Sequence, residues 1–171
     1  MAFNSNCSLW NVEEGPYFSN WKIGPLKQKG PHCTSTVLSM LTGSNGQTPE
    51  YFQERINTQD PVTWSKELIP FGLKLAYCPT DIRKVKYYVD EILEISDLFT
   101  VSYYKPKTDY QFLNDPDETG WVCGSHIVIC HQDTIIDPAT GTIMKANVHP
   151  FLESHTKRIF RVVPAEHLRG L

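Results

Sequence analysis

The chain has 171 residues, of which 40% are hydrophobic and 20% are charged, and its formal net charge at pH 7 is -3. This length and composition are typical of one folded domain, and the weakly acidic balance gives no reason to expect nucleic acid or an anionic membrane as a partner. No apolar run approaches the ~20 residues of a membrane span, and the first residues lack the basic start and apolar core of a secretion signal. We therefore expect a single domain over residues 1–171, with a cytoplasmic location unless a leaderless route exports it.

The cysteines indicate a reducing compartment. Their number is odd and their spacing irregular, at Cys7, Cys33, Cys78, Cys123 and Cys130. Without a signal peptide, this pattern favours free thiols over a disulfide framework.

The N-terminal part is predicted to be an irregular arm followed by a short helix. Residues 1–29 carry aromatic side chains among Asn, Gly and Pro, which is typical of a packed segment without regular structure. A helix is predicted between Pro31, which a helix interior does not tolerate, and Gly43, a natural stop. Its apolar face is formed by Val37, Leu38, Met40 and Leu41.

Cys33 falls in or just before the first turn of this helix. Backbone N–H groups without partners and the partial positive charge of a helix start stabilise a thiolate and lower the thiol pKa. The thiolate is the nucleophilic form of cysteine. The alternative is that Cys33 is a small buried hydrophobic residue, as most free cysteines are.

The middle of the chain is predicted to hold three helices and two strands. Thr48-Pro49 and Asp60-Pro61 each combine a capping side chain with proline at the first helical position, and the second helix must end before Pro70. Residues 73–77 alternate as a strand does, and residues 98–104 are rich in aromatic and β-branched side chains. Between these strands the longest helix is predicted from Pro79, with apolar residues at Ile82, Val85, Val89, Ile92 and Leu93.

A polar loop over residues 105–119 separates these elements from an antiparallel sheet. Its acidic residues lack the ligand spacing of a calcium loop, so we interpret it as a solvated loop. Strands are then predicted at 125–131, 134–137, 142–144 and 158–163, with turns at Gln132-Asp133 and at 138–141. The expected fold class is α+β, with N-terminal helices, including the helix that bears Cys33, packed on a C-terminal antiparallel sheet.

The hairpin places a histidine and an aspartate on one face. With a two- or four-residue turn, even-numbered residues of the first strand share a face with odd-numbered residues of the second. His126 and Asp137 are therefore predicted to lie close enough to touch. An imidazole held by a carboxylate can take a proton from a thiol, which makes Cys33, His126 and Asp137 candidate nucleophile, base and orienting residue. A three-residue turn would break the pairing, and the two side chains would then be a core histidine and a turn residue.

Metal binding is the rival interpretation of the same stretch. Four potential zinc ligands, Cys123, His126, Cys130 and His131, lie within nine residues. On a strand His131 points away from His126 and Cys130, so we expect neither a metal nor another cofactor. The polar surroundings of His149, His155 and His167 predict surface residues.

The motifs resemble the papain-like cysteine peptidase superfamily. The similarity lies in Gln28 followed by Cys33 at a helix start, in Gly124-Ser125-His126-Ile127-Val128, and in Asp137-Pro138-Ala139-Thr140-Gly141. It is closest to the compact bacterial branch that includes the leader peptidases of bacteriocin exporters. The resemblance implies a papain-like fold in which Cys33 is the nucleophile, His126 the base and Asp137 its orienting residue, with Gln28 helping to stabilise the oxyanion.

A cysteine hydrolase that cleaves an amide or peptide bond of a peptide or protein substrate is therefore the expected function. The same acyl-enzyme chemistry also serves a protein glutamine deamidase or an acyl or peptidyl transferase. A non-catalytic binding module on this scaffold is the alternative from another class, because a fold does not determine a function.

Overall fold

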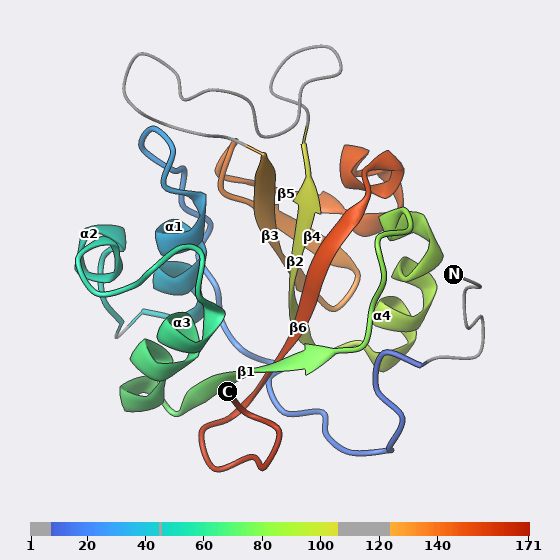
Figure 1. Cartoon of the computed structure of the whole chain (residues 1–171), viewed down its shortest axis with the longest axis horizontal. Coiled ribbons are helices and arrows are strands. Elements are labelled where there is room, and N and C mark those ends of the chain that lie inside the picture. The colour runs from blue at the N-terminus through green and yellow to red at the C-terminus, as the bar shows by residue number, and fades with distance from the viewer. Residues whose placement is uncertain (1–7, 45, 106–123) are drawn as a thin grey trace.

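A six-stranded antiparallel sheet separates two groups of helices (Figure 1). The computed structural model describes residues 8–44, 46–105 and 124–171. The strands are β1 (Leu73–Cys78), β2 (Leu98–Tyr104), β3 (Ser125–His131), β4 (Thr134–Asp137), β5 (Thr142–Lys145) and β6 (Thr156–Pro164), in the order β1-β6-β2-β3-β4-β5. The predicted α+β class is confirmed, although β1 and β2 from the middle of the chain join the sheet.

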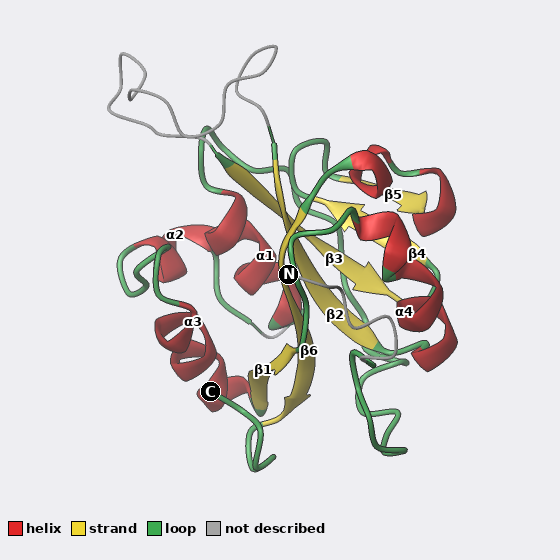
Figure 2. Ribbon diagram, turned by 45° about the vertical axis from the view of Figure 1, so that its right-hand side comes forward, coloured by secondary structure: helices red, strands yellow, loops and turns green. Residues whose placement is uncertain are grey.

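The helices cover both faces of the sheet (Figures 1 and 2). They are α1 (Cys33–Leu41), α2 (Pro49–Gln53), α3 (Pro61–Leu68) and α4 (Val89–Ile95), with short 3-10 turns at Ile69–Phe71, Val85–Tyr87, Ala146–Val148 and Pro150–Glu153. Ile127 and Ile129 of β3 pack in the cluster that contains α1, whereas Val128 and Cys130 pack in the cluster that contains α4. The alternation of β3 therefore supplies two separate cores.

The predicted starts of α2 and α3 are confirmed by their caps. The Thr48 side chain accepts a hydrogen bond from the Tyr51 N–H, and the Asp60 side chain accepts one from the Val62 N–H. Each proline occupies the first helical turn, where its missing N–H costs nothing. α3 ends at Leu68, before Pro70, as predicted.

The long helix predicted from Pro79 is wrong over its first half. Ile82 is 65% exposed, and α4 begins only at Val89. The Arg83 carbonyl accepts a hydrogen bond from the Thr156 N–H, and the Val85 N–H donates to the Ser154 carbonyl, both at 3.0 Å. Because these backbone groups pair with the segment before β6, they cannot take part in helical hydrogen bonds.

Helix α1 is enclosed on all sides, and every one of its residues is buried. The hydroxyls of Ser35, Thr36 and Ser39 all donate to backbone carbonyls. The Thr36 hydroxyl donates to the His32 carbonyl at 2.7 Å, and the Ser39 hydroxyl donates to the Gln47 carbonyl at 2.6 Å. The packing of the helix therefore fixes the position of Cys33 at its start.

The aromatic N-terminal arm is anchored by a buried ion pair. Arg161 and Asp97 are 1% and 0% exposed, and the guanidinium donates to the Asp97 carboxylate at 2.7 Å. The same carboxylate accepts hydrogen bonds from the backbone N–H groups of Tyr17 and Phe18, each at 2.8 Å. The rings of Trp10 and Tyr17 lie 4.8 and 4.9 Å from the guanidinium. This cluster holds the arm against the end of the sheet.

Among the residues that the structure describes, none of the helices combines the length and apolar character needed to cross a membrane.

Asp97→Ala is expected to lower the free energy of unfolding by about 3–5 kcal/mol, because it leaves the Arg161 charge buried without a partner. Urea unfolding measures this change. The control is Asp133→Ala, which removes the partner of Lys145 at a site where both side chains are more than half exposed. A surface pair contributes only about 0–1 kcal/mol, so equal losses in the two variants would contradict the prediction.

Candidate active site

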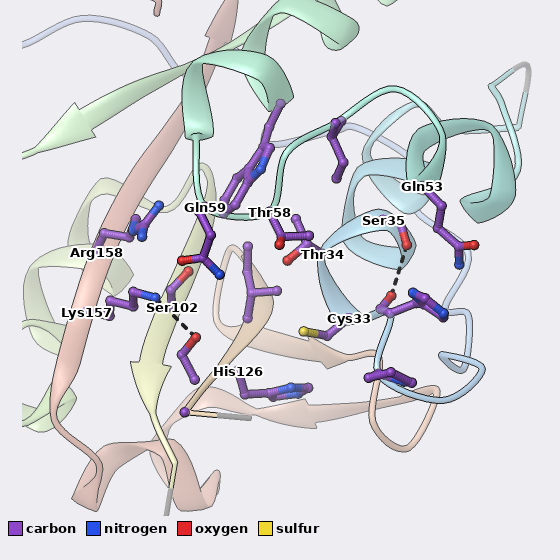
Figure 3. A pocket seen from close by; sticks show the side chains of 17 residues that line it. Cys33, Thr34, Ser35, Gln53, Thr58, Gln59, Ser102, His126, Lys157 and Arg158 are labelled. Atoms are coloured by element: carbon purple, nitrogen blue, oxygen red, sulfur yellow. Dashed lines mark hydrogen bonds between the residues drawn. The ribbon is translucent and has the colours of Figure 1, made fainter. Parts of the chain in front are cut away.

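Cys33 is the first residue of α1, and the helix start has no side-chain cap. His32 occupies the cap position without donating or accepting a capping hydrogen bond through its side chain. The first backbone N–H groups and the positive end of the helix dipole are thus left to act on the Cys33 side chain and on whatever lies beside it. Figure 3 shows the sulfur pointing into a pocket of about 260 Å³ that residues 31–35 partly line.

The β3–β4 hairpin brings the predicted histidine and aspartate together. Its turn has two residues, Gln132 and Asp133, and Cys130 pairs with Ile135. The parity predicted from a two-residue turn is therefore confirmed. His126 Nε2 lies 2.8 Å from an Asp137 carboxylate oxygen, and both side chains are largely buried.

The Asp137 carboxylate is held by three donors. His126 Nε2 and the Ala139 N–H bind one oxygen, and His149 Nε2 binds the other at 2.9 Å. Burial alone would raise the pKa of Asp137, but the hydrogen bonds from the two histidines and from Ala139 outweigh it and hold the pKa well below its usual range. The group is therefore a carboxylate at every physiological pH.

The thiol and the imidazole shift each other's protonation. Burial raises the pKa of Cys33, but the hydrogen bond and the charge of His126 lower it below its ordinary value, helped by the Thr34 side chain and the Ile127 N–H. Burial lowers the pKa of His126, but Asp137 and Cys33 together raise it to about 9. Because Nε2 contacts Asp137, Nδ1 is the nitrogen left for the thiol. The directions of both shifts favour a thiolate–imidazolium pair at neutral pH.

The other described thiols show the opposite behaviour. Burial raises the pKa of Cys78 and the pKa of Cys130 to about 12, since neither has an imidazole beside it. Burial by itself therefore does not activate a cysteine in this fold. The contact with His126 distinguishes Cys33.

An aromatic wall shields the His126–Asp137 contact. Tyr103 lies opposite His126 in the β2–β3 ladder, with ring centroids 5.7 Å apart in an edge-on arrangement, and its ring also contacts Phe151. Burial and the Asp137 charge raise the pKa of Tyr103, so its hydroxyl stays neutral. Excluding water here strengthens the interaction between carboxylate and imidazole.

His149 was expected at the surface, but it is 5% exposed and belongs to the site. Its Nδ1 accepts a hydrogen bond from the Phe151 N–H at 3.0 Å, so the ring is the neutral tautomer that donates from Nε2 to Asp137. A sequence signal did exist. His149-Pro150 repeats the cap-and-proline pattern of Thr48-Pro49 and Asp60-Pro61, and His149 caps a 3-10 turn.

Gln28 lies beside the Asp137 turn rather than in the pocket. Its backbone N–H donates to the Pro138 carbonyl at 2.7 Å, while its side-chain Nε2 donates to the Gly30 carbonyl at 2.8 Å. The turn is packed closely against this segment, because Gly141 has a φ of +67° and an added Cβ would lie 2.9 Å from Lys27 Cβ. The role of Gln28 at an oxyanion stays a prediction.

The rival zinc ligands do not converge. His131 Nε2 lies 2.8 Å from the Ser19 carbonyl, on the face of β3 opposite His126 and Cys130. Within residues 8–44, 46–105 and 124–171 no three metal-ligating side chains gather around one point. Cys123 and the acidic residues of the 105–119 loop, Asp115, Asp117 and Glu118, lie outside the described residues.

Comparison of the chain with protein-family models, with curated proteins and with solved structures found no match.

Iodoacetamide is expected to label Cys33 before Cys78 and Cys130, at a rate that rises less steeply with pH between about pH 6 and pH 8 than the rate of an ordinary thiol. A thiolate already formed does not gain reactivity as pH rises, whereas an ordinary thiol gains about tenfold per pH unit below its pKa. Mass spectrometry of peptides after limiting alkylation measures the site and the rate. A rate for Cys33 that climbs with pH as a free thiol's does would contradict the ion pair.

His149→Phe is expected to lower the rate of Cys33 alkylation at neutral pH by about tenfold, since a hydrogen bond to a charged group contributes ~1.5–3 kcal/mol. The matched variant is His149→Gln, whose amide N–H can replace the Nε2 donor and should recover most of the rate. Thermal unfolding of both proteins separates loss of stability from loss of the donor. Equal rates in the Phe and Gln variants would show that the donor is not what matters.

Proposed function

We propose that the protein is a papain-like cysteine hydrolase that cleaves an amide or peptide bond through an acyl-enzyme on Cys33. The observation that carries the proposal is the linked set of a low-pKa thiol at a helix start, an imidazole and a buried carboxylate. These residues occur in the chain order Cys33, His126, Asp137, which is the order of the resemblance. The pocket beside them gives a substrate access to the sulfur.

The proposed reaction begins with attack of the Cys33 thiolate on the substrate carbonyl carbon. The oxyanion accepts hydrogen bonds from the uncapped N–H groups of the α1 start. The resemblance implies a second donor, the Gln28 amide, which would have to turn from the Gly30 carbonyl toward the pocket. The His126 imidazolium gives its proton to the leaving amine, and the C–N bond breaks to leave a thioester.

Water completes the cycle. His126, now neutral, takes a proton from a water molecule that attacks the thioester carbonyl, and the carboxylic acid product leaves with the regenerated thiolate–imidazolium pair. Asp137 keeps the ring oriented in both steps through the Nε2 hydrogen bond. His149 does not exchange a proton in this scheme, because its Nδ1 is occupied by the Phe151 N–H.

A mixture of synthetic peptides incubated with the protein is expected to yield cleaved products, and Cys33→Ala should yield none. Gln28→Ala should reduce turnover by about 10²–10³-fold if its amide is an oxyanion donor. Cys78→Ala, which removes a thiol outside the pocket, is the matched control. Full activity of Cys33→Ala would end the proposal.

Product masses distinguish the alternatives that share this chemistry. Hydrolysis divides one peptide into two with the addition of water, glutamine deamidation adds about one mass unit without cleavage, and transfer joins the acyl group to an added amine. Peptides that bind but remain intact, together with an unreactive Cys33, would indicate the binding module instead.

A further inference from the structure

Two adjacent cations of β6 line the pocket that holds Cys33 (Figure 3). Neighbouring side chains on a regular strand point to opposite faces, so Lys157 and Arg158 would normally be separated. The β2–β6 ladder contains a register shift here, in which Ser102 pairs with Arg158 but Tyr103 pairs with Thr156. Lys157 is thus an extra residue in the ladder, and bulges of this kind redirect side chains.

Among the residues that the structure describes, these cations have no carboxylate partner. Within the described part of the chain, neither residue forms an ion pair, and no Asp or Glu lines the pocket. Lys157 Nζ donates a hydrogen bond to Ser125 Oγ at 3.4 Å and lies 5.9 Å from the centroid of the Tyr104 ring. By contrast, Lys84 and Lys86 at the surface both pair with Glu153.

The guanidinium of Arg158 is held in place but left unsatisfied. It lies 5.5 Å from the ring of Trp64, which also lines the pocket. Its Nη1 is buried and has no hydrogen-bond partner. Most buried donors are hydrogen-bonded, and the planar fork of a guanidinium matches a carboxylate. Among the described residues, Arg158 therefore keeps a donor available for an acceptor that enters the pocket.

Both cations line the same pocket as Cys33, and Lys157 is near enough for its charge to interact with the thiolate. Burial and the neighbouring charge of Arg158 lower the pKa of Lys157, while the Cys33 thiolate acts in the opposite direction. An anion bound by these side chains thus lies beside the bond that Cys33 would attack, rather than on a distant surface. On a peptide or protein, the anion in question is a carboxylate.

We infer that Arg158 and Lys157 form a subsite for a substrate carboxylate next to the bond attacked by Cys33. This inference rests on the proposed hydrolase function, and it makes the substrate an acidic peptide or an amide that carries a nearby carboxylate. The uncharged walls of the pocket, among them Thr58 and Gln59, leave these two cations as its only charged side chains besides His32, His126 and Cys33 among the described residues.

Iodoacetate and iodoacetamide test the subsite as a matched anionic and neutral pair. Their rate ratio for Cys33 is independent of the thiolate fraction, since both reagents react with the thiolate. We expect the iodoacetate to iodoacetamide ratio to exceed that of N-acetylcysteine amide by about tenfold, and to fall as salt screens the attraction. Lys157→Gln/Arg158→Gln should return the ratio to the free-thiol value.

The charge-matched control is Lys145→Gln/Arg169→Gln, which alters two cations outside this pocket by the same total charge. This variant should keep the wild-type ratio. Rapid alkylation of Cys33 by iodoacetamide with a ratio equal to that of the free thiol would overturn the subsite while leaving the nucleophile intact. Slow reaction with both reagents would instead contradict the proposed function.

A binding measurement tests the carboxylate subsite even if Cys33 reacts slowly with both reagents. The Cys33→Ala protein is titrated with N-acetylglutamate α-amide, with its neutral glutamine analogue and with inorganic phosphate, while NMR follows the Arg158 side-chain and Trp64 indole N–H signals. Saturable shifts with the glutamate compound alone support the inference. Shifts that are equal for the glutamine compound, or that are stronger with phosphate, would overturn the assignment to a carboxylate.

Discussion

The site depends on one carboxylate that satisfies three donors at once. Asp137 links the His126 ring, the His149 ring and the backbone of its own turn, so a single side chain joins β3, β4 and the segment before β6. Because the donors compensate its burial, the carboxylate remains charged in a setting that would otherwise favour the neutral acid. The negative charge of Asp137 stabilises the imidazolium form of His126, and the imidazolium stabilises the thiolate form of Cys33. The ionised form of Cys33 therefore depends on His126, and that of His126 depends on Asp137.

The scaffold holds this arrangement by packing rather than by flexible loops. α1 is buried along its whole length between α2 and the sheet, so Cys33 cannot move away from β3 without opening the core. Near the start of β2, Asp97 and Arg161 hold the N-terminal arm in an equally buried polar cluster. The Asp97 carboxylate accepts three hydrogen bonds in this cluster, whereas Arg161 Nε has no hydrogen-bond partner among the described residues.

Local signals predicted much of this structure. The caps at Thr48 and Asp60 and the two-residue turn of the β3–β4 hairpin depend on neighbouring residues only, and the hairpin parity was enough to bring His126 to Asp137. The failed half of the 79–95 helix depended on residues far along the chain, since Arg83 and Val85 pair with 154–156. His149 was missed for the same reason, because its burial is created by contacts with Asp137 and Phe151 that hydropathy does not show.

The register shift at Lys157 has a consequence for how this pocket can diversify. The pairing of β6 with β1 is regular from Ile159 onward, and its pairing with β2 resumes regularly at Arg158. Loss of one residue at the bulge would restore simple alternation, turning one cation out of the pocket without altering Cys33, His126 or Asp137. The charge of the pocket therefore depends on the number of residues in β6 as well as on their identity. A single-codon insertion or deletion at this position would therefore change the charge of the pocket and leave Cys33, His126 and Asp137 in place.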